Sequence, residues 1–173
     1  MATPTSFNLN DNQKAERKLL VTAVNVGTGE TEDWEIIGAG VEESAIELNM
    51  NSESITDILG VTETSITKSE PKQTFEPYTI RGGSKLAFIL DDIITRNALS
   101  ELSAFKVLIA KGYIGEGNAY KAEVHKNCTI TVTSYGGSAY VDMPIEISFS
   151  NDKEHGTVDE ITKGLTFTKT ASV

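Results

Sequence analysis

The residues best suited to acid–base chemistry in this 173-residue chain are its two histidines, His125 and His155. A zinc site or a catalytic triad needs a histidine placed near further ligands or near a nucleophile. Neither histidine lies in an HExxH, an HxH or a cysteine-paired pattern. We therefore expect His125, between Val124 and Lys126, to be a solvated strand residue and His155 to be a turn residue.

Two other patterns could carry chemistry at a cleft or at a phosphate. Asp91 and Asp92 are adjacent carboxylates, but on a helix neighbouring side chains point about 100° apart, which favours a solvated face. The run Arg81-Gly82-Gly83-Ser84 precedes a predicted helix, whose N-terminus could bind an anion. No GxxxxGK[ST] or GxGxxG motif surrounds this run, so a tight turn is the better interpretation.

Cys128 is the only cysteine, so no disulfide can form within the chain. It shares one face of a predicted strand with Ile130 and Val132, which indicates a small buried apolar residue. The triplet Asn127-Cys128-Thr129 matches a glycosylation acceptor but is uninformative without a secretory signal. We therefore expect no catalytic residues, no metal ligands and no cofactor, hence a structural or binding protein and not an enzyme.

The composition narrows the class of partner. Fifteen Lys and Arg against 25 Asp and Glu give a net charge of −10, which argues against a surface that grips nucleic acid through its phosphates. No apolar run reaches the ~20 residues that span a bilayer, and the first residues resemble no signal peptide, so we expect no membrane partner. Hydrophobic residues make up 39% of the chain, so self-association could supply part of the burial.

One amphipathic segment predicts a helix over residues 85–102, with Ser84 as its N-cap. Its apolar stripe recurs every four residues and should cover one flank of a sheet. The stripe consists of Leu86, Leu90, Ile94, Ala98 and Leu102, widened by Ile89 and Ile93.

Strand-like alternation fills most of the remaining chain and predicts about nine strands. The clearest case has Val141, Met143, Ile145, Ile147 and Phe149 on one face, within residues 139–150. The predicted strands cover 19–26, 34–37, 61–69, 72–81, 104–114, 119–127, 128–134, 139–150 and 165–169.

The predicted fold class is mainly β, an antiparallel β-sandwich or open barrel with one flanking α-helix. Residues 1–17 carry no periodic signal and are expected to form a flexible arm. Residues 18–170 are expected to form a single β domain with a long loop or hairpin at about 38–60.

The order of these elements resembles the major tail tube proteins of long-tailed bacteriophages. The resemblance rests on DWEIIGAGVEE, on DILGVTETSITKSEPKQTFEP, on a Gly-Gly turn into one helix and on SAYVDMPIEISFS. It covers most of residues 19–168 and lies in the order and character of elements, without an invariant motif.

The resemblance implies a structural virion protein that self-assembles into stacked hexameric rings, forming a hollow tube through which genomic DNA passes without specific binding. Its implied partners are further copies of itself and the tape measure, distal tail and tail terminator proteins. Assembly would take place in the host cytoplasm. By the same resemblance, the long excursion contacts a neighbouring subunit or ring, and its apolar residues are Val41, Ile46, Leu48, Ile55, Ile58 and Leu59.

A ring of about 24 strands, ~4.8 Å apart and tilted ~40°, would enclose a lumen about 35–40 Å across. A wall of hydroxyl and acidic groups would repel a duplex weakly and offer it no cationic contacts. Residues on wet strand faces could line this lumen or equally face bulk solvent: Thr129, Thr131, Thr133, Asp142, Glu146 and Ser148.

Two other functions fit parts of the sequence. A decoration, baseplate or head protein of a virion would share the acidic, β-rich composition. A carbohydrate-binding β-sandwich would need an exposed aromatic platform, for which the chain offers Trp34, Tyr113, Tyr120, Tyr135 and Tyr140.

Overall fold

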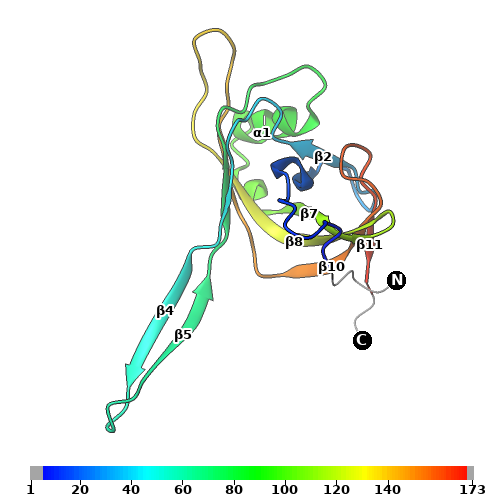
Figure 1. The fold of residues 1–173 in the computed structure, drawn as a ribbon. Helices are drawn as coiled ribbons and strands as arrows, with labels where there is room; N and C mark the ends of the chain where they lie inside the picture. The colour runs from blue at the N-terminus through cyan, green and yellow to red at the C-terminus, as the bar shows by residue number, and fades with distance from the viewer. Residues whose placement is uncertain (1–5, 171–173) are drawn as a thin grey trace.

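The computed structural model describes residues 6–170 and shows a curled antiparallel sheet, a helix packed against it and a projecting hairpin (Figure 1). In chain order the elements are η1 (Arg17–Leu19), β1 (Leu20–Asn25), β2 (Trp34–Ile37), β3 (Ile46–Glu47), β4 (Met50–Thr56), β5 (Thr62–Ser69), β6 (Lys72–Phe75), α1 (Lys85–Thr95), η2 (Leu99–Ser103), β7 (Phe105–Glu116), β8 (Ala119–Val132), β9 (Ile145–Ser148), β10 (Lys153–Val158) and β11 (Phe167–Lys169).

The long strand β8 joins two parts of the sheet. One of its edges pairs with β7, while the other pairs with β10 over Tyr120–His125 and with β9 over Thr129–Val132. Asn127 lies between these two stretches with a φ of 53°. We call β2, β1, β7, β10, β11 and the first half of β8 the large section, and the second half of β8 with β9, β6 and β3 the small section.

Strand β7 is buried on both faces, because a hydrophobic cluster lies on each side of the large section. Val107 and Ile109 belong to the inner cluster, while Leu108 and Ala110 belong to the outer cluster, which Leu165 helps to cover. The inner cluster also contains buried side chains of the small section and of the helix: Ile130, Ile145, Ile147, Leu86, Leu90 and Ile93.

The predicted fold class, a mainly β sandwich or open barrel with one flanking helix, is confirmed. The helix is shorter than predicted, since α1 ends at Thr95 and not near residue 102. Asn97 has a φ of 56°, and the chain then forms the separate 3-10 helix η2. Ala98 and Leu102 still pack against the inner cluster, so the apolar pattern continues past the break and conceals it.

Two predicted strands are also too long. The predicted strand at 139–150 is wrong outside β9, and Val141 is 54% exposed in the loop between β8 and β9. This loop is tied to the chain after β6, because Ile80 N donates to Val141 O and Met143 N donates to Tyr78 O. The predicted strand at 72–81 likewise ends at Phe75.

Strand β10 is formed by a segment whose polar residues predict a turn, so His155 is a strand residue and that expectation is wrong. The strand pairs with β8 on one side and β11 on the other. A Cβ atom at Gly156 would collide with the carbonyl oxygen of Thr168, so glycine permits this close pairing.

The N-terminus of α1 is held by two side chains. Ser84 Oγ accepts a hydrogen bond from Ala87 N at 3.3 Å, which confirms the predicted N-cap. Glu35, in β2, accepts from Ser84 Oγ at 2.6 Å, from Lys85 N at 2.8 Å and from Leu86 N at 2.9 Å. A carboxylate at this position satisfies free N–H groups and complements the helix dipole. Glu35 therefore attaches the helix to an edge strand of the sheet.

We expect Glu35→Ala to lower the free energy of unfolding by about 2 kcal/mol, because hydrogen bonds to a charged acceptor are lost at partly buried donors. Urea unfolding followed by circular dichroism would measure this loss. The matched control is Glu32→Ala, which removes only an exposed ion pair with Lys106 and should cost less than about 1 kcal/mol. Equal losses from the two variants would contradict the assigned role of Glu35.

Candidate functional site

The small section turns a polar face away from the core. Thr129 pairs directly with Ser148 and Thr131 with Glu146 across β8 and β9, so four of the residues predicted for a wet face lie together. Strand β6 extends this face with Lys72, whose Nζ lies 3.2 Å from Glu146 Oε1. Glu47 of β3 is the cross-strand partner of Lys72 and adds an exposed carboxylate. The face is thus composed of hydroxyl groups, one exposed ion pair and this carboxylate.

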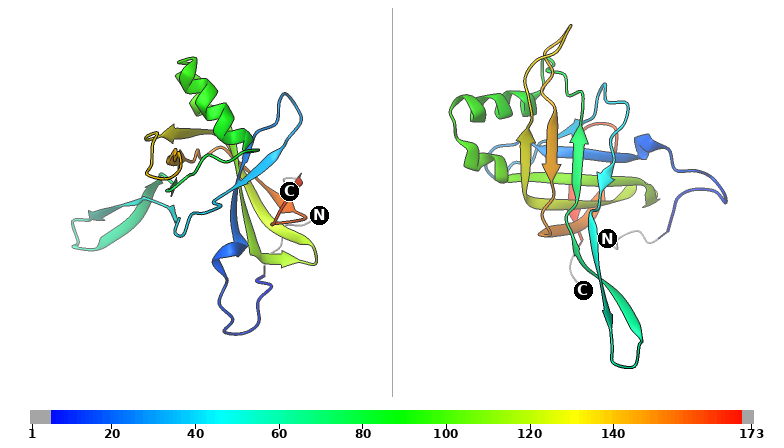
Figure 2. Two further views of the ribbon diagram at one scale, coloured as in Figure 1. Left: turned by 90° about the horizontal axis from the view of Figure 1, so that it is seen from above. Right: turned by 90° about the vertical axis from the view of Figure 1, so that its left-hand side faces the viewer.

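The remaining two residues of that predicted set lie outside the paired strands. Asp142 Oδ1 accepts a hydrogen bond from Thr79 Oγ1 at 2.6 Å, and Thr133 Oγ1 donates to Pro144 O at 3.1 Å. Both belong to the loop between β8 and β9. Figure 2 shows this loop at the opposite end of the molecule from the hairpin.

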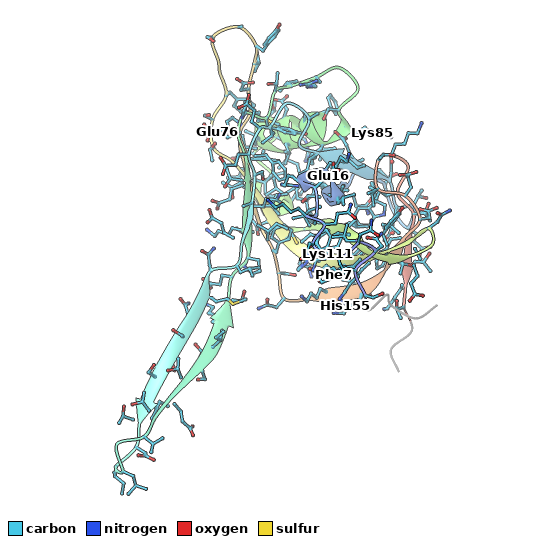
Figure 3. The ribbon with its side chains drawn as sticks, in the orientation of Figure 1. Phe7, Glu16, Glu76, Lys85, Lys111 and His155 are labelled. Carbon is cyan, nitrogen blue, oxygen red and sulfur yellow. The ribbon has the colours of Figure 1, made fainter. Side chains whose placement is uncertain are left out.

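Strands β4 and β5 form a hairpin that projects from the small section into solvent (Figures 1 and 3). It continues from β3 and β6, so its base belongs to the sheet while its outer part contacts solvent on both faces. Hydroxyl groups link its strands, with Ser54 and Thr64 2.8 Å apart and Thr56 and Thr62 2.9 Å apart.

The tip of the hairpin is ordered by Asp57 and presents apolar side chains. Asp57 Oδ1 accepts from Leu59 N at 2.8 Å and from Val61 N at 2.9 Å, and Asp57 N donates to Val61 O. Ile58 is fully exposed and Leu59 is 82% exposed. Each such side chain would gain roughly 1.5–3 kcal/mol of transfer free energy on burial. Exposed apolar side chains gathered in one place are typical of a surface that becomes buried on assembly.

The apolar residues predicted to contact a neighbouring subunit fall into two groups. Leu48 and Ile55 are exposed, like Ile58 and Leu59 at the tip. Val41 and Ile46 instead pack against the inner cluster and are half-buried. The hairpin also extends further along the chain than the predicted excursion, since β5 runs to Ser69.

His125 is not the solvated residue that its neighbours predict, because only 4% of it is exposed. Its Nδ1 lies 2.8 Å from Ser150 O and its Nε2 lies 3.3 Å from Glu123 Oε1. The hydrogen bond from His125, helped by the charges of Lys111 and Lys153, lowers the pKa of Glu123 to about 2 against the opposing effect of burial. Sequence reasoning missed this polar pair, since alternation does not show that Phe149 and Ser150 lie against the ring of His125.

The other candidates for chemistry have ordinary surroundings. Cys128 is buried as predicted, and burial raises the pKa of its thiol. Asp92 Oδ2 accepts from Arg96 Nε at 2.7 Å on the solvent side of α1, and Asp91 is exposed. His155 is exposed at the surface of β10 (Figure 3). Within residues 6–170 no three His, Cys, Asp or Glu side chains are grouped to hold a metal ion.

Trp34, the one tryptophan of the chain, is buried in the outer cluster, whereas Tyr135 and Tyr140 are exposed on the loop between β8 and β9. An aromatic platform for a sugar would therefore lack its indole ring. None of the helices in the described part of the chain is long and apolar enough to cross a bilayer.

The stability that Glu123 provides should depend on pH. Because the pKa of Glu123 in the folded protein lies below its usual value of 4.5, the contribution is present above about pH 4.5 and is lost as pH falls toward 2. At pH 6 we expect the free energy of unfolding of wild type to exceed that of Glu123→Gln by on the order of 2 kcal/mol, after allowance for partial exposure. Urea titrations at several pH values would measure this difference.

Glu53→Gln is the control for that series, because Glu53 is an exposed hairpin carboxylate that forms no ion pair with the described residues. A stability difference between wild type and Glu123→Gln that stays constant from pH 6 to pH 3 would rule out the proposed electrostatic role.

No protein family model matches this chain, and no curated protein matches its sequence. Solved structures match its fold. A chain of the PVC sheath–tube complex of an extracellular contractile injection system, in the extended state, is 14% identical with a TM-score of 0.52, covering 85% of this chain and 94% of that chain. A chain of the tube-terminating cap of the anti-feeding prophage is 12% identical with a TM-score of 0.53, covering 87% and 95%.

The PVC sheath/tube terminator in the extended state gives a TM-score of 0.50 at 12% identity, covering 81% of this chain and 95% of that chain. At such identities the likeness concerns the fold alone. The chain therefore has a tail tube-like fold, of the kind found in the tubes and tube terminators of contractile injection systems.

Proposed function

We propose that this protein is a tail tube subunit that assembles head to tail into stacked hexameric rings around a hollow channel. The observation that carries the proposal is the small section, which combines a polar face, a free edge at β3 and a hairpin extension with an apolar tip. The tube-like fold of the solved structures supports the same assignment.

Ring formation would use the edges of the small section. Strand β3 is an edge strand of only two paired residues, Ile46 and Glu47. An exposed strand edge carries free N–H and C=O groups that can pair with another chain. Six copies of four strands would give the barrel of about 24 strands, with a lumen about 35–40 Å across.

The polar face of the small section would line this lumen. This face would offer a passing molecule the hydroxyl groups of Thr131 and Ser148 and the ion pair of Lys72 and Glu146. Glu47 would add a negative charge, which repels phosphates. Genomic DNA could then slide through without being held, as in the tail of a bacteriophage virion. Tape measure, distal tail and tail terminator proteins would bind the tube or its ends, and the function would involve no reaction.

A tube terminator is the second candidate function, because two of the matching structures are terminating proteins. A terminator forms a closed ring that stops growth, whereas a tube subunit has a repeating head-to-tail interface and polymerises. Negative-stain electron microscopy of the purified protein over a concentration series separates the two. Open tubes of variable length support a tube subunit, and single rings support a terminator.

The hairpin should be required for stacking. We expect replacement of residues 54–64 by Asn-Gly, a preferred two-residue turn, to leave a folded subunit whose tube yield falls more than about tenfold. The reason is that burial of two tip side chains contributes several kcal/mol to each stacking contact, and ~1.4 kcal/mol is already a tenfold effect. Sedimentation and electron microscopy would measure the yield.

Ser54→Ala is the matched control, since it removes one hydroxyl group of the same hairpin without shortening it. It should assemble like wild type. Tubes of normal yield from the shortened hairpin would overturn its role in stacking.

A further inference from the structure

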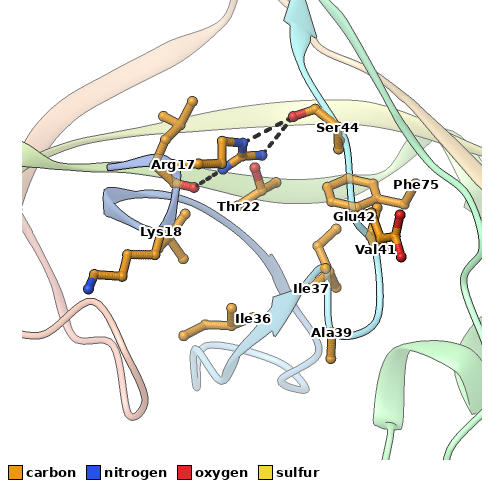
Figure 4. Close-up of a pocket in the computed structure, with 13 residues that line it drawn as sticks. Arg17, Lys18, Thr22, Ile36, Ile37, Ala39, Val41, Glu42, Ser44 and Phe75 are labelled. Atoms are coloured by element: carbon orange, nitrogen blue, oxygen red, sulfur yellow. Dashed lines mark hydrogen bonds between the residues drawn. The ribbon is translucent and has the colours of Figure 1, made fainter. Parts of the chain in front are cut away.

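The curled sheet does not close, and a cavity of about 470 Å³ lies at its opening (Figure 4). The two edge strands β2 and β3 are consecutive in the chain and are not paired with each other within the described residues. The loop of residues 38–45 runs between them along the opening. The apolar lining of the cavity includes Leu20, Ile36, Ile37, Ala39, Val41 and Phe75.

Most of the residues that line this cavity are apolar, and its charged residues are Arg17, Lys18 and Glu42. Arg17 donates from Nε and Nη2 to Ser44 O at 3.2 and 2.8 Å, and from Nη1 to Leu20 O at 2.6 Å. These carbonyl groups hold the guanidinium in place but leave its charge without a carboxylate partner among residues 6–170. Lys18 is also exposed here and pairs only with Glu16.

The hairpin has the complementary properties. Its tip presents Ile58 and Leu59, while Glu53, Asp57 and Glu63 form no ion pair with the described residues. Residues 50–69 contain these three acidic residues and one basic residue, Lys68, so the hairpin carries a net negative charge. A cavity of about 150 Å³ holds one benzene ring, so the cavity at the sheet opening has room for both apolar tip side chains.

We propose that the hairpin tip of one copy inserts into this cavity on a second copy, with its acidic flanks beside Arg17. The inference rests on the proposed function and identifies the surface that receives the hairpin. Tip and cavity are different surfaces of one chain, so the contact is heterologous and repeats from copy to copy. Because Lys18 is paired with Glu16 and Glu42 adds a negative charge, the electrostatic attraction in this arrangement comes from Arg17.

The loop between β8 and β9 is the rival receiver, because Tyr140 and Val141 are exposed on it. Its charges do not suit the hairpin. Asp142 lies in the loop, and Asp91 raises the pKa of Tyr135 in addition to the larger effect of burial, so its surroundings are acidic.

Disulfide trapping in assembled protein tests the proposal. We expect the double variant Leu59→Cys/Ala39→Cys to give, after mild oxidation, a ladder of covalent dimers, trimers and longer species on a non-reducing gel. Reduction should collapse the ladder to monomer. Either single variant should give at most a dimer, since the native Cys128 is buried.

Two control pairs identify other receivers and occupants. Leu59→Cys/Tyr140→Cys tests the rival loop, and Ser6→Cys/Ala39→Cys tests whether the N-terminal segment fills the cavity. A ladder from either pair, or an intrachain disulfide in Ser6→Cys/Ala39→Cys, in place of the Leu59→Cys/Ala39→Cys ladder overturns the proposal. If tubes form but Leu59→Cys/Ala39→Cys gives no ladder, the docking site is wrong while the tube function stands. If wild type forms neither rings nor tubes, both fail.

Discussion

The change of partner along one edge of β8 is the constraint on which the other surfaces depend. Before Asn127 this edge pairs with β10, and after it the edge pairs with β9. A single sheet therefore divides into a large section buried on both faces and a small section buried on one. Strand β9 pairs with β6, and β6 pairs with β3. The hairpin continues from β3 and returns to β6 (Figure 2).

Polar contacts between distant segments hold this arrangement together where apolar packing is incomplete. Glu35 attaches the start of α1 to β2, and the partly buried pair of Glu123 and His125 lies where β8, β10 and the chain after β9 meet. Such contacts are costly when only one partner is present, so they favour one packing of the sheet over its alternatives.

The hairpin, by contrast, exposes apolar side chains. It leaves isoleucine and leucine in water at its tip, on a loop that Asp57 keeps in one conformation. Preorganisation reduces the entropy lost when such a segment becomes buried in a partner. A net charge of −10 opposes non-specific association of the same subunits, so the local match of charge and shape must select the contact that forms.

Much of the fold could be predicted from the sequence, because local patterns report burial on one face. The apolar stripe after Ser84 predicts the helix, the alternation in residues 104–114 predicts β7, and the alternation in residues 139–150 predicts a longer strand that contains β9. Four of the residues predicted for a wet face also share one surface, because paired strands with a period of two place them there.

Tertiary structure alone decided the rest. Alternation does not specify which strand lies alongside, so it revealed neither β10 nor the burial of His125 against Phe149 and Ser150. The break at Asn97 was hidden because the apolar residues beyond it still reach the same core. Residues 61–69 resemble an ordinary strand in sequence, and only the structure shows that they form β5, the second strand of an exposed hairpin. A residue pattern specifies which face is apolar, whereas the packing of distant segments determines whether that face is covered.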